Sequence, residues 1–292
     1  MRKKLILGFS DTFGTAVKFF TDVLGQYYEV IRDDQNPEYL IFGDPNFGES
    51  HYKFTGRCVK IFYTGENVRP NYFTYDHAIT FDHENSPKHY RLPLYVPEMK
   101  MYTYEKWTNN WLHLINKKID LEKEYDMKKD FCSFVQSNPN QEMRNQFFHF
   151  LNERKRVDSA GPHLNNVGYV LPRQGVEHKI DFLKTRKFNI AFENGSYPGY
   201  VTEKILNAFY ANTIPIYWGS PTVKVDFNTK AFINCHDHKN FEEIWDRIRE
   251  LDSSKNKYLD MLSQPAFENN IPNKYCNLKS LIDWFDTFVY KG

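Results

Sequence analysis

A glutamate and a lysine stand side by side where a loop is expected to run into a helix. Residues 192–204 read FENGSYPGYVTEK, so a strand should end at Phe192 and a helix begin near Thr202. A helix N-terminus has free N–H groups and a partial positive charge, which attract anions. A cation is unfavourable there, so Lys204 predicts a nearby anion such as a nucleotide diphosphate. Glu203 is suited to accept hydrogen bonds from ribose or sugar hydroxyls, although spacing alone fits a solvated surface pair equally well.

A second carboxylate follows an expected strand in the first half of the chain. Residues 62–67 read FYTGEN, which places Glu66 just past the strand and Gly65 where the backbone can be approached closely. Ligands of open α/β sheets bind at the carboxyl ends of the strands, so a glutamate there is placed to act as a general base. On position alone, an ordinary exposed glutamate is the simpler interpretation.

Short apolar runs alternate with polar or helical stretches along the whole chain. Runs that are apolar on both faces are typical of parallel strands covered on both sides. The expected strands are 5–9, 28–31, 39–42, 59–63, 77–81, 131–136, 188–192, 214–218 and 232–234. The expected helices are 16–24, 141–154, 201–210, 241–251 and 278–290. Two alternating halves predict an α/β protein with two Rossmann-like domains that face each other across a cleft.

The domain boundary is expected near the end of a segment rich in Trp, Tyr and Lys. This segment, 98–129, should be partly helical and partly irregular. Residues 1–129 would then form the first domain and 130–277 the second. The C-terminal helix, 278–292, is expected to pack back on the first domain.

Composition excludes several classes of protein. The 292 residues include 38 basic and 37 acidic side chains, and this balance disfavours nucleic acid as the main partner. No apolar run approaches the ~18 residues of a membrane span, and the first residues are too short a run for a signal peptide. The scattered Cys58, Cys132, Cys235 and Cys276 predict buried free thiols, and therefore a cytoplasmic protein. Aromatic residues, 17% of the chain, should mainly fill two cores.

Metal binding is not favoured by the residues. The run Cys235-His236-Asp237-His238 has alternating histidines, but nothing nearby completes a tetrahedral set of ligands. The chain contains no Asp-x-Asp motif that would hold a diphosphate through a metal. We expect no required cofactor, with a divalent cation at most stimulating activity.

The block that contains Lys204 continues as FENGSYPGYVTEKILNAFYANTIPIYWGSP. This stretch closely resembles the signature of the α-1,3/4-fucosyltransferase family. The resemblance implies a glycosyltransferase of the GT-B type, in which the tyrosine, glutamate and lysine of YVTEK bind GDP-fucose. By position these are Tyr200, Glu203 and Lys204, with Asn194 as a neighbour.

Three further stretches resemble the same family. FYTGEN resembles its bacterial branch, where the glutamate is the proposed base, and this implies Glu66 here. Residues 76–95 (DHAITFDHENSPKHYRLPLY) also look like family sequence. FCSFVQSN resembles the entry strand of the nucleotide domain, which ends with Ser137 and Asn138. The resemblance implies that the first domain binds the acceptor and the second binds GDP-fucose.

One departure from the family concerns the diphosphate. Several relatives carry an arginine that contacts it, in the loop corresponding to 157–168. Here that loop reads VDSAGPHLNNVG, with Leu164 and no arginine. Either another cation replaces the arginine, or Lys204 acts with the helix dipole alone. The candidate cations are His163, Arg156, Arg173 and Lys179.

The resemblance also implies a reaction. Glu66 would deprotonate the acceptor hydroxyl in a single displacement that inverts the sugar carbon and turns GDP-β-L-fucose into an α-linkage. The implied acceptor is the 3-hydroxyl of N-acetylglucosamine in a galactosyl-N-acetylglucosamine unit of a Lewis-type surface glycan, such as lipopolysaccharide. An oligosaccharide or glycolipid acceptor could bring the protein to the inner face of the membrane. The alternatives are a two-Rossmann glycosyltransferase with another donor and a non-catalytic glycan-binding protein.

Overall fold

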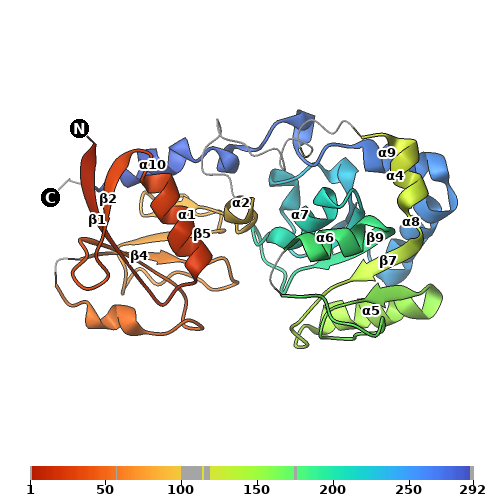
Figure 1. Ribbon diagram of the computed structural model, residues 1–292, viewed down its shortest axis with the longest axis horizontal. Coiled ribbons are helices and arrows are strands. Elements are labelled where there is room, and N and C mark those ends of the chain that lie inside the picture. The colour runs from red at the N-terminus through yellow and green to blue at the C-terminus, as the bar shows by residue number, and fades with distance from the viewer. Residues whose placement is uncertain (1, 57, 100–113, 115–118, 174–175, 290–292) are drawn as a thin grey trace. The chain divides into compact units, whose positions relative to one another are not determined.

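The computed structural model describes residues 2–56, 58–99, 114, 119–173 and 176–289 (Figure 1). The chain divides into two compact units, of which unit 1 comprises Met1–Thr108 and Lys274–Gly292, and unit 2 comprises Asn109–Asn273. Helix α4 (Leu121–Met127) thus belongs to unit 2, whereas the boundary predicted from the sequence lies after it. Most of the predicted irregular segment before α4 lies outside the described residues.

Unit 1 is built on a six-stranded sheet with the strand order β2-β1-β3-β4-β5-β6. Every neighbouring pair in it is parallel. The strands are β1 (Lys3–Ser10), β2 (Tyr28–Arg32), β3 (Tyr39–Phe42), β4 (Val59–Tyr63), β5 (His77–Thr80) and β6 (His89–Arg91). The helices are α1 (Gly14–Leu24), α2 (Tyr95–Glu98) and α10 (Lys279–Phe285). The chain reverses direction across the sheet between β1 and β3, which makes the carboxyl ends of these strands a switch point where ligands bind in such folds.

The C-terminal residues belong to unit 1 through specific contacts. Trp284 Nε1 donates a hydrogen bond to the carbonyl of Pro87 at 3.0 Å, and the Tyr28 hydroxyl donates to Asp286 at 2.6 Å. The ring of Phe288 stacks on His77, with centroids 3.8 Å apart. The end of the chain therefore covers β5 and β2 of the first sheet.

Unit 2 is built on a five-stranded parallel sheet with the order β11-β10-β9-β7-β8. The strands are β7 (Asp130–Phe134), β8 (Val157–Ser159), β9 (Arg186–Phe192), β10 (Ile214–Trp218) and β11 (Ile233–Asn234). The helices besides α4 are α5 (Glu142–Arg154), α6 (Val176–Lys184), α7 (Glu203–Tyr210), α8 (Phe241–Ser253) and α9 (Lys255–Ser263). Short 3₁₀ helices in this unit are Val223–Val225, Thr229–Ala231, Cys235–Asp237 and Glu268–Asn270, and those in unit 1 are Ser50–Lys53 and Lys274–Cys276. The switch point of this sheet lies between β7 and β9.

Aromatic residues fill the core of unit 2, as the sequence predicted. Phe147 of α5 stacks on Phe192 of β9 at 4.7 Å, in a cluster that also includes buried residues of α8 and α9. Helices α6 and α7 contribute to a separate, smaller cluster and pack against β9. The sheet is therefore fixed by helices from two clusters, which leaves the loops at its carboxyl ends to form a site.

Candidate active site

A buried carboxylate organises the loop between β9 and α7. Glu193 follows β9 directly and is fully buried. Its Oε1 accepts a hydrogen bond from the backbone N–H of Thr202, and its Oε2 accepts one from the Thr202 hydroxyl, both at 2.7 Å. Thr202 holds the N-cap position in an extended conformation, but its side chain does not cap the helix. The helix therefore begins at Glu203, two residues after the start of the predicted helix 201–210, and Glu193 satisfies the backbone N–H of the residue before it.

Lys204 completes this cluster. Its Nζ lies 3.0 Å from Glu193 Oε2 and donates to the Thr202 hydroxyl at 2.9 Å, while Glu203 is more distant at 3.8 Å. The Lys204 side chain is only 12% exposed. The anion that the position of Lys204 predicts is thus supplied in this structure by the chain itself. Whether a diphosphate binds there as well stays a prediction.

Burial and the neighbouring charges together shift the pKa values of both glutamates. Burial raises the pKa of Glu193, and Lys204 opposes that effect. Burial also acts to raise the pKa of Glu203, but Lys204 and Lys179 outweigh it and hold that pKa below its ordinary value. Lys179 is therefore a candidate replacement for the family arginine whose charge acts at Glu203.

The segment after β10 holds the loop in place. The backbone N–H of Glu193 donates to the carbonyl of Trp218 at 2.8 Å. Gly199, at φ +85°, donates its N–H to the hydroxyls of Ser220 at 2.9 Å and Thr222 at 3.0 Å. A Cβ on Gly219 would lie 2.4 Å from Glu193 Cγ, so glycine is required there for the glutamate to fit. The loop is a fixed structure with backbone anchors at both ends.

A buried arginine joins β7 to β9 across the switch point. Arg144 of α5 is fully buried and donates from Nη1 to Gln136 Oε1 and Asn194 Oδ1, both at 2.9 Å. Its Nη2 donates to the carbonyl of Asn138 at 2.6 Å, whereas its Nε has no partner. Arginine stays protonated in proteins, so this edge of the sheet carries a permanent buried cation.

The structure brings some predicted site residues together and separates others. Asn194 and the backbone of Asn138 meet at Arg144, while Glu203 and Lys204 lie at the start of α7. Ser137 is exposed beyond β7. Tyr200 is 1% exposed, and its carbonyl accepts a hydrogen bond from the Tyr217 hydroxyl at 3.3 Å. Tyr200 is thus a packed residue of the loop in this structure.

The other cations proposed in place of the family arginine have other contacts or are exposed. His163 Nε2 lies 2.8 Å from Asn145 Oδ1. The Arg156 side chain is 68% exposed and pairs with Asp158, and Arg173 is exposed. Sequence reasoning missed Arg144, although a signal exists. Arg144 occupies the helical stripe that continues with the buried Phe147, Phe148 and Leu151, so a charge stands on the apolar face of α5.

The predicted base lies in unit 1, at the carboxyl end of β4. Glu66 is exposed, and its backbone N–H donates to the Thr64 hydroxyl at 2.9 Å. That hydroxyl donates in turn to the buried Asp44 at 2.9 Å. A Cβ on Gly65 would lie 2.6 Å from Leu94 Cδ1, so any larger residue would displace the Leu94 side chain. The backbone that carries Glu66 is therefore held firmly, while the residue itself is exposed.

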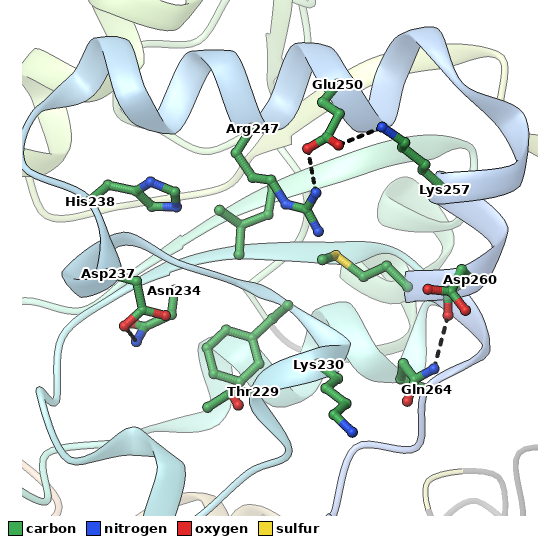
Figure 2. Close-up of a pocket in the computed structure, with 13 residues that line it drawn as sticks. Thr229, Lys230, Asn234, Asp237, His238, Arg247, Glu250, Lys257, Asp260 and Gln264 are labelled. Atoms are coloured by element: carbon green, nitrogen blue, oxygen red, sulfur yellow. Dashed lines mark hydrogen bonds and ion pairs between the residues drawn. The ribbon is translucent and has the colours of Figure 1, made fainter.

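A separate pocket of about 500 Å³ lies along the edge strand β11 (Figure 2). Arg247 and Lys257 face Glu250 across its upper wall, and Phe232, Ile233 and Met261 contribute apolar surface. None of the predicted site residues lines it. Asp237 in its wall accepts a hydrogen bond from Asn234 at 2.9 Å, and the part of the chain that is described contains no group of metal-ligating side chains.

Two further predictions from the sequence concern the state of the four cysteines and membrane-spanning helices. Cys132, Cys235 and Cys276 are buried free thiols, and Cys58 is a partly exposed one. Within the described ranges, no helix combines the length and the apolar character that crossing a membrane requires.

Comparison with known proteins gives a consistent result. Two family models match the chain. The model of the "Alpha-(1,3)-fucosyltransferase FucT N-terminal domain" matches residues 5–97, and the model of "Glycosyltransferase family 10 (fucosyltransferase) C-term" matches residues 121–265. The chain is 36% identical to the alpha-(1,3)-fucosyltransferase FucT of Helicobacter pylori over 95% of its own length, and it spans 62% of that relative. It is 29% identical, over 32% of the chain and 27% of the relative, to the human 4-galactosyl-N-acetylglucosaminide 3-alpha-L-fucosyltransferase 9.

A solved structure shares the whole architecture. The crystal structure of an alpha1,3-fucosyltransferase with GDP-fucose superposes with a TM-score of 0.79 and 30% identity, covering 100% of this chain and 92% of that one. The predicted fold class is confirmed: the chain is an α/β protein of the GT-B type with two units, each built on a parallel sheet.

Proposed function

The chain belongs to the α-1,3-fucosyltransferase family, glycosyltransferase family 10, and on that premise we propose that it transfers L-fucose from GDP-fucose to a glycan. The observation that carries the proposal is the arrangement of Lys204 and the N-terminus of α7 at the carboxyl edge of the unit 2 sheet. The ammonium is ordered there by Glu193 and Thr202. The related crystal structure contains GDP-fucose, which supports the choice of donor.

The nucleotide diphosphate binds in this proposal to Lys204 and the first turn of α7. Charge builds up on the departing phosphate as the glycosidic bond to GDP breaks. Ordered donors in such a site stabilise developing charge, and the loss of one typically costs ~3–4 kcal/mol. Lys179 supports this role as a second cation, since its charge is felt at Glu203. These groups would allow transfer without a required metal, as expected from the sequence.

Glu66 is the general base of the proposed reaction. This exposed residue lies at the end of β4 on a backbone fixed by Thr64, which suits a group that must meet an incoming hydroxyl. Glu66 takes the proton of the acceptor hydroxyl as the oxygen attacks the anomeric carbon, GDP leaves from the opposite side, and the configuration inverts. A positioned base typically contributes ~10²–10⁴ in rate.

The acceptor in this proposal is the 3-hydroxyl of N-acetylglucosamine in a galactosyl-N-acetylglucosamine unit. The name of the human relative, which acts on a 4-galactosyl-N-acetylglucosaminide, supports this choice. A Lewis-type lipopolysaccharide as the natural acceptor, the cytoplasmic location and the association with the inner face of the membrane stay predictions from the sequence.

The test is a transfer assay with the purified chain. GDP-fucose, GDP-mannose and UDP-galactose are each offered with galactosyl-β1,4-N-acetylglucosamine, and the linkage of the product is determined by NMR. We expect rapid transfer from GDP-fucose alone, giving an α-1,3 linkage. Comparable turnover of UDP-galactose would favour a glycosyltransferase with another donor. Glycan binding with neither transfer nor hydrolysis of any donor would favour the non-catalytic alternative.

A further inference from the structure

Glu193 is a buried glutamate for which the proposed reaction has no direct use. A carboxylate taken out of water is strongly unfavourable unless it is hydrogen-bonded and paired. Glu193, which is fully buried, satisfies both conditions through Thr202 and Lys204, at 2.7 to 3.0 Å. These partners lie directly before the first turn of α7 and inside it. The carboxylate therefore binds the start of this helix together with the ammonium that extends from it.

The position of the ammonium depends on this contact. Lysine has a long flexible side chain whose ordering costs conformational entropy. Lys204 Nζ is held between Glu193 Oε2 at 3.0 Å and the Thr202 hydroxyl at 2.9 Å, and that hydroxyl is itself bound to Glu193. The carboxylate of Glu193, the hydroxyl of Thr202 and the ammonium of Lys204 each contact the other two.

We propose that Glu193 is a positioning residue of the donor site, which holds the Lys204 ammonium at the N-terminus of α7 before the nucleotide diphosphate arrives. The inference rests on the proposed transfer from GDP-fucose and deepens it. Glu193 touches no substrate in this proposal, and it acts only through Lys204. A cation that is already ordered loses no freedom when the donor binds and needs no rearrangement as the phosphate leaves.

The surroundings of Glu193 support this role. Gly219 makes the space that the glutamate occupies, since a Cβ there would lie 2.4 Å from its Cγ and 2.9 Å from its Cβ. Electrostatic effects connect Glu193 with Glu203, Arg144 and Tyr217 as well as with Lys204. The charge of the carboxylate thus acts on two buried or nearly buried cations, Lys204 on α7, which it contacts, and Arg144 on α5.

A competing explanation is that Glu193 only stabilises the loop through its hydrogen bonds to Thr202. The two roles differ in their dependence on Lys204. If Glu193 acts through Lys204, its replacement should matter only while Lys204 is present. If it serves the loop alone, its replacement should have the same effect with or without Lys204. A double-mutant cycle separates these cases.

The experiment compares Glu193→Gln, Lys204→Met and the double variant with the parent protein. We measure kcat and KM for GDP-fucose, the Kd of GDP by calorimetry, and thermal unfolding. Glu193→Gln should lower kcat/KM about 10–100-fold, the range expected when a catalytic cation is displaced by about 1 Å. In the Lys204→Met background, the same substitution should change kcat/KM and the Kd of GDP by less than about threefold. Where transfer by Lys204→Met is too slow to measure, the Kd of GDP provides the comparison.

Two further variants complete the design. Glu250→Gln removes a carboxylate from Lys257 in a surface pair of the same unit, at 2.6 Å, and should leave the kinetics unchanged. Gly219→Ala displaces Glu193 without changing any charge and should reproduce the loss seen in Glu193→Gln. If Glu193→Gln does not fold, Gly219→Ala takes its place in the double-mutant cycle with Lys204→Met.

The outcomes separate the inference from the function on which it rests. Equal losses from Glu193→Gln in both backgrounds, or parent-like kinetics in Glu193→Gln, would overturn the positioning role. A parent protein that neither binds GDP nor transfers fucose would overturn the proposed function instead. Losses confined to proteins that retain Lys204 would establish the inference.

Discussion

Replacing Lys204 with methionine removes a cation from a buried carboxylate while keeping most of the length and apolar volume of the side chain. Glu193 is fully buried, and the Lys204 side chain is 12% exposed. Removing one partner of a buried ion pair typically costs about 3–5 kcal/mol in the free energy of unfolding, because the other charge stays buried. Thr202 still donates two hydrogen bonds to Glu193. We therefore expect the lower end of this range, about 3 kcal/mol at neutral pH.

The size of this loss should depend on pH. Burial raises the pKa of Glu193 above its ordinary value of 4.5, and Lys204 opposes the shift. A carboxyl group with a raised pKa stabilises the fold while it is protonated at low pH, and this contribution is lost as the pH rises through the pKa in the folded state. Lys204 limits the loss in the parent protein. Lys204→Met should therefore match the parent closely below pH 4.5 and become progressively less stable above it.

Urea unfolding at a series of pH values, followed by tryptophan fluorescence, measures this difference. Lys257→Met is the matched control, because Lys257 also pairs with a glutamate but with 57% of its side chain exposed. It should stay within about 0.5 kcal/mol of the parent at every pH. Adding Glu193→Gln to Lys204→Met should restore much of the lost stability above pH 4.5, because the buried carboxylate that lost its lysine partner is no longer present. A loss for Lys204→Met that is the same at all pH values, or no loss at all, would refute the buried pair.

Three other outcomes are expected. Glu66→Gln should bind GDP-fucose with nearly unchanged affinity but transfer fucose ~10²-fold more slowly, and activity within about fivefold of the parent would move the search for a base to residues 76–89. Transfer should survive exhaustive treatment with EDTA, and a complete loss that added metal reverses would show that a metal holds the diphosphate. Lys204→Ala should lower kcat/KM by a factor that corresponds to ~3 kcal/mol in transition-state stabilisation, and normal turnover with normal GDP affinity in calorimetry would leave Lys204 with a structural role only.

The sheets were the most predictable part of the fold. Buried parallel strands are continuous apolar runs, and all nine expected strands are present with small shifts at their ends. The two strands that were missed, β6 and β8, have only three residues each and include His89, Arg91 and Asp158. Such short polar segments become strands only because a longer neighbour pairs with them. That pairing is a long-range contact, which local periodicity does not encode.

In the candidate site, too, local sequence patterns could be interpreted while long-range contacts could not. Lys204, Glu203 and Asn194 could be located because they belong to a continuous block whose order along the chain is distinctive. The contact of Glu193 with Lys204 could not be predicted, because a loop of this length can close in many ways. Arg144 was open to prediction from its place on the apolar stripe of α5. Its partners Gln136 and Asn194 were not open to prediction, because they follow two different strands that become neighbours only in the sheet.

The pairing of Lys204 with Glu193 also bears on how a Lys204→Ala substitution would divide between binding and rate. An ammonium whose charge is already balanced by a carboxylate at 3.0 Å attracts a bound diphosphate less than an unbalanced one would. Its direction is nevertheless fixed, so its interaction grows as negative charge develops on the departing phosphate. Interactions that are stronger in the transition state than in the ground state raise kcat. We therefore expect the larger share of the loss in kcat and the smaller share in the Kd of GDP. A loss confined to GDP affinity would mean that Lys204 leaves Glu193 when the donor binds.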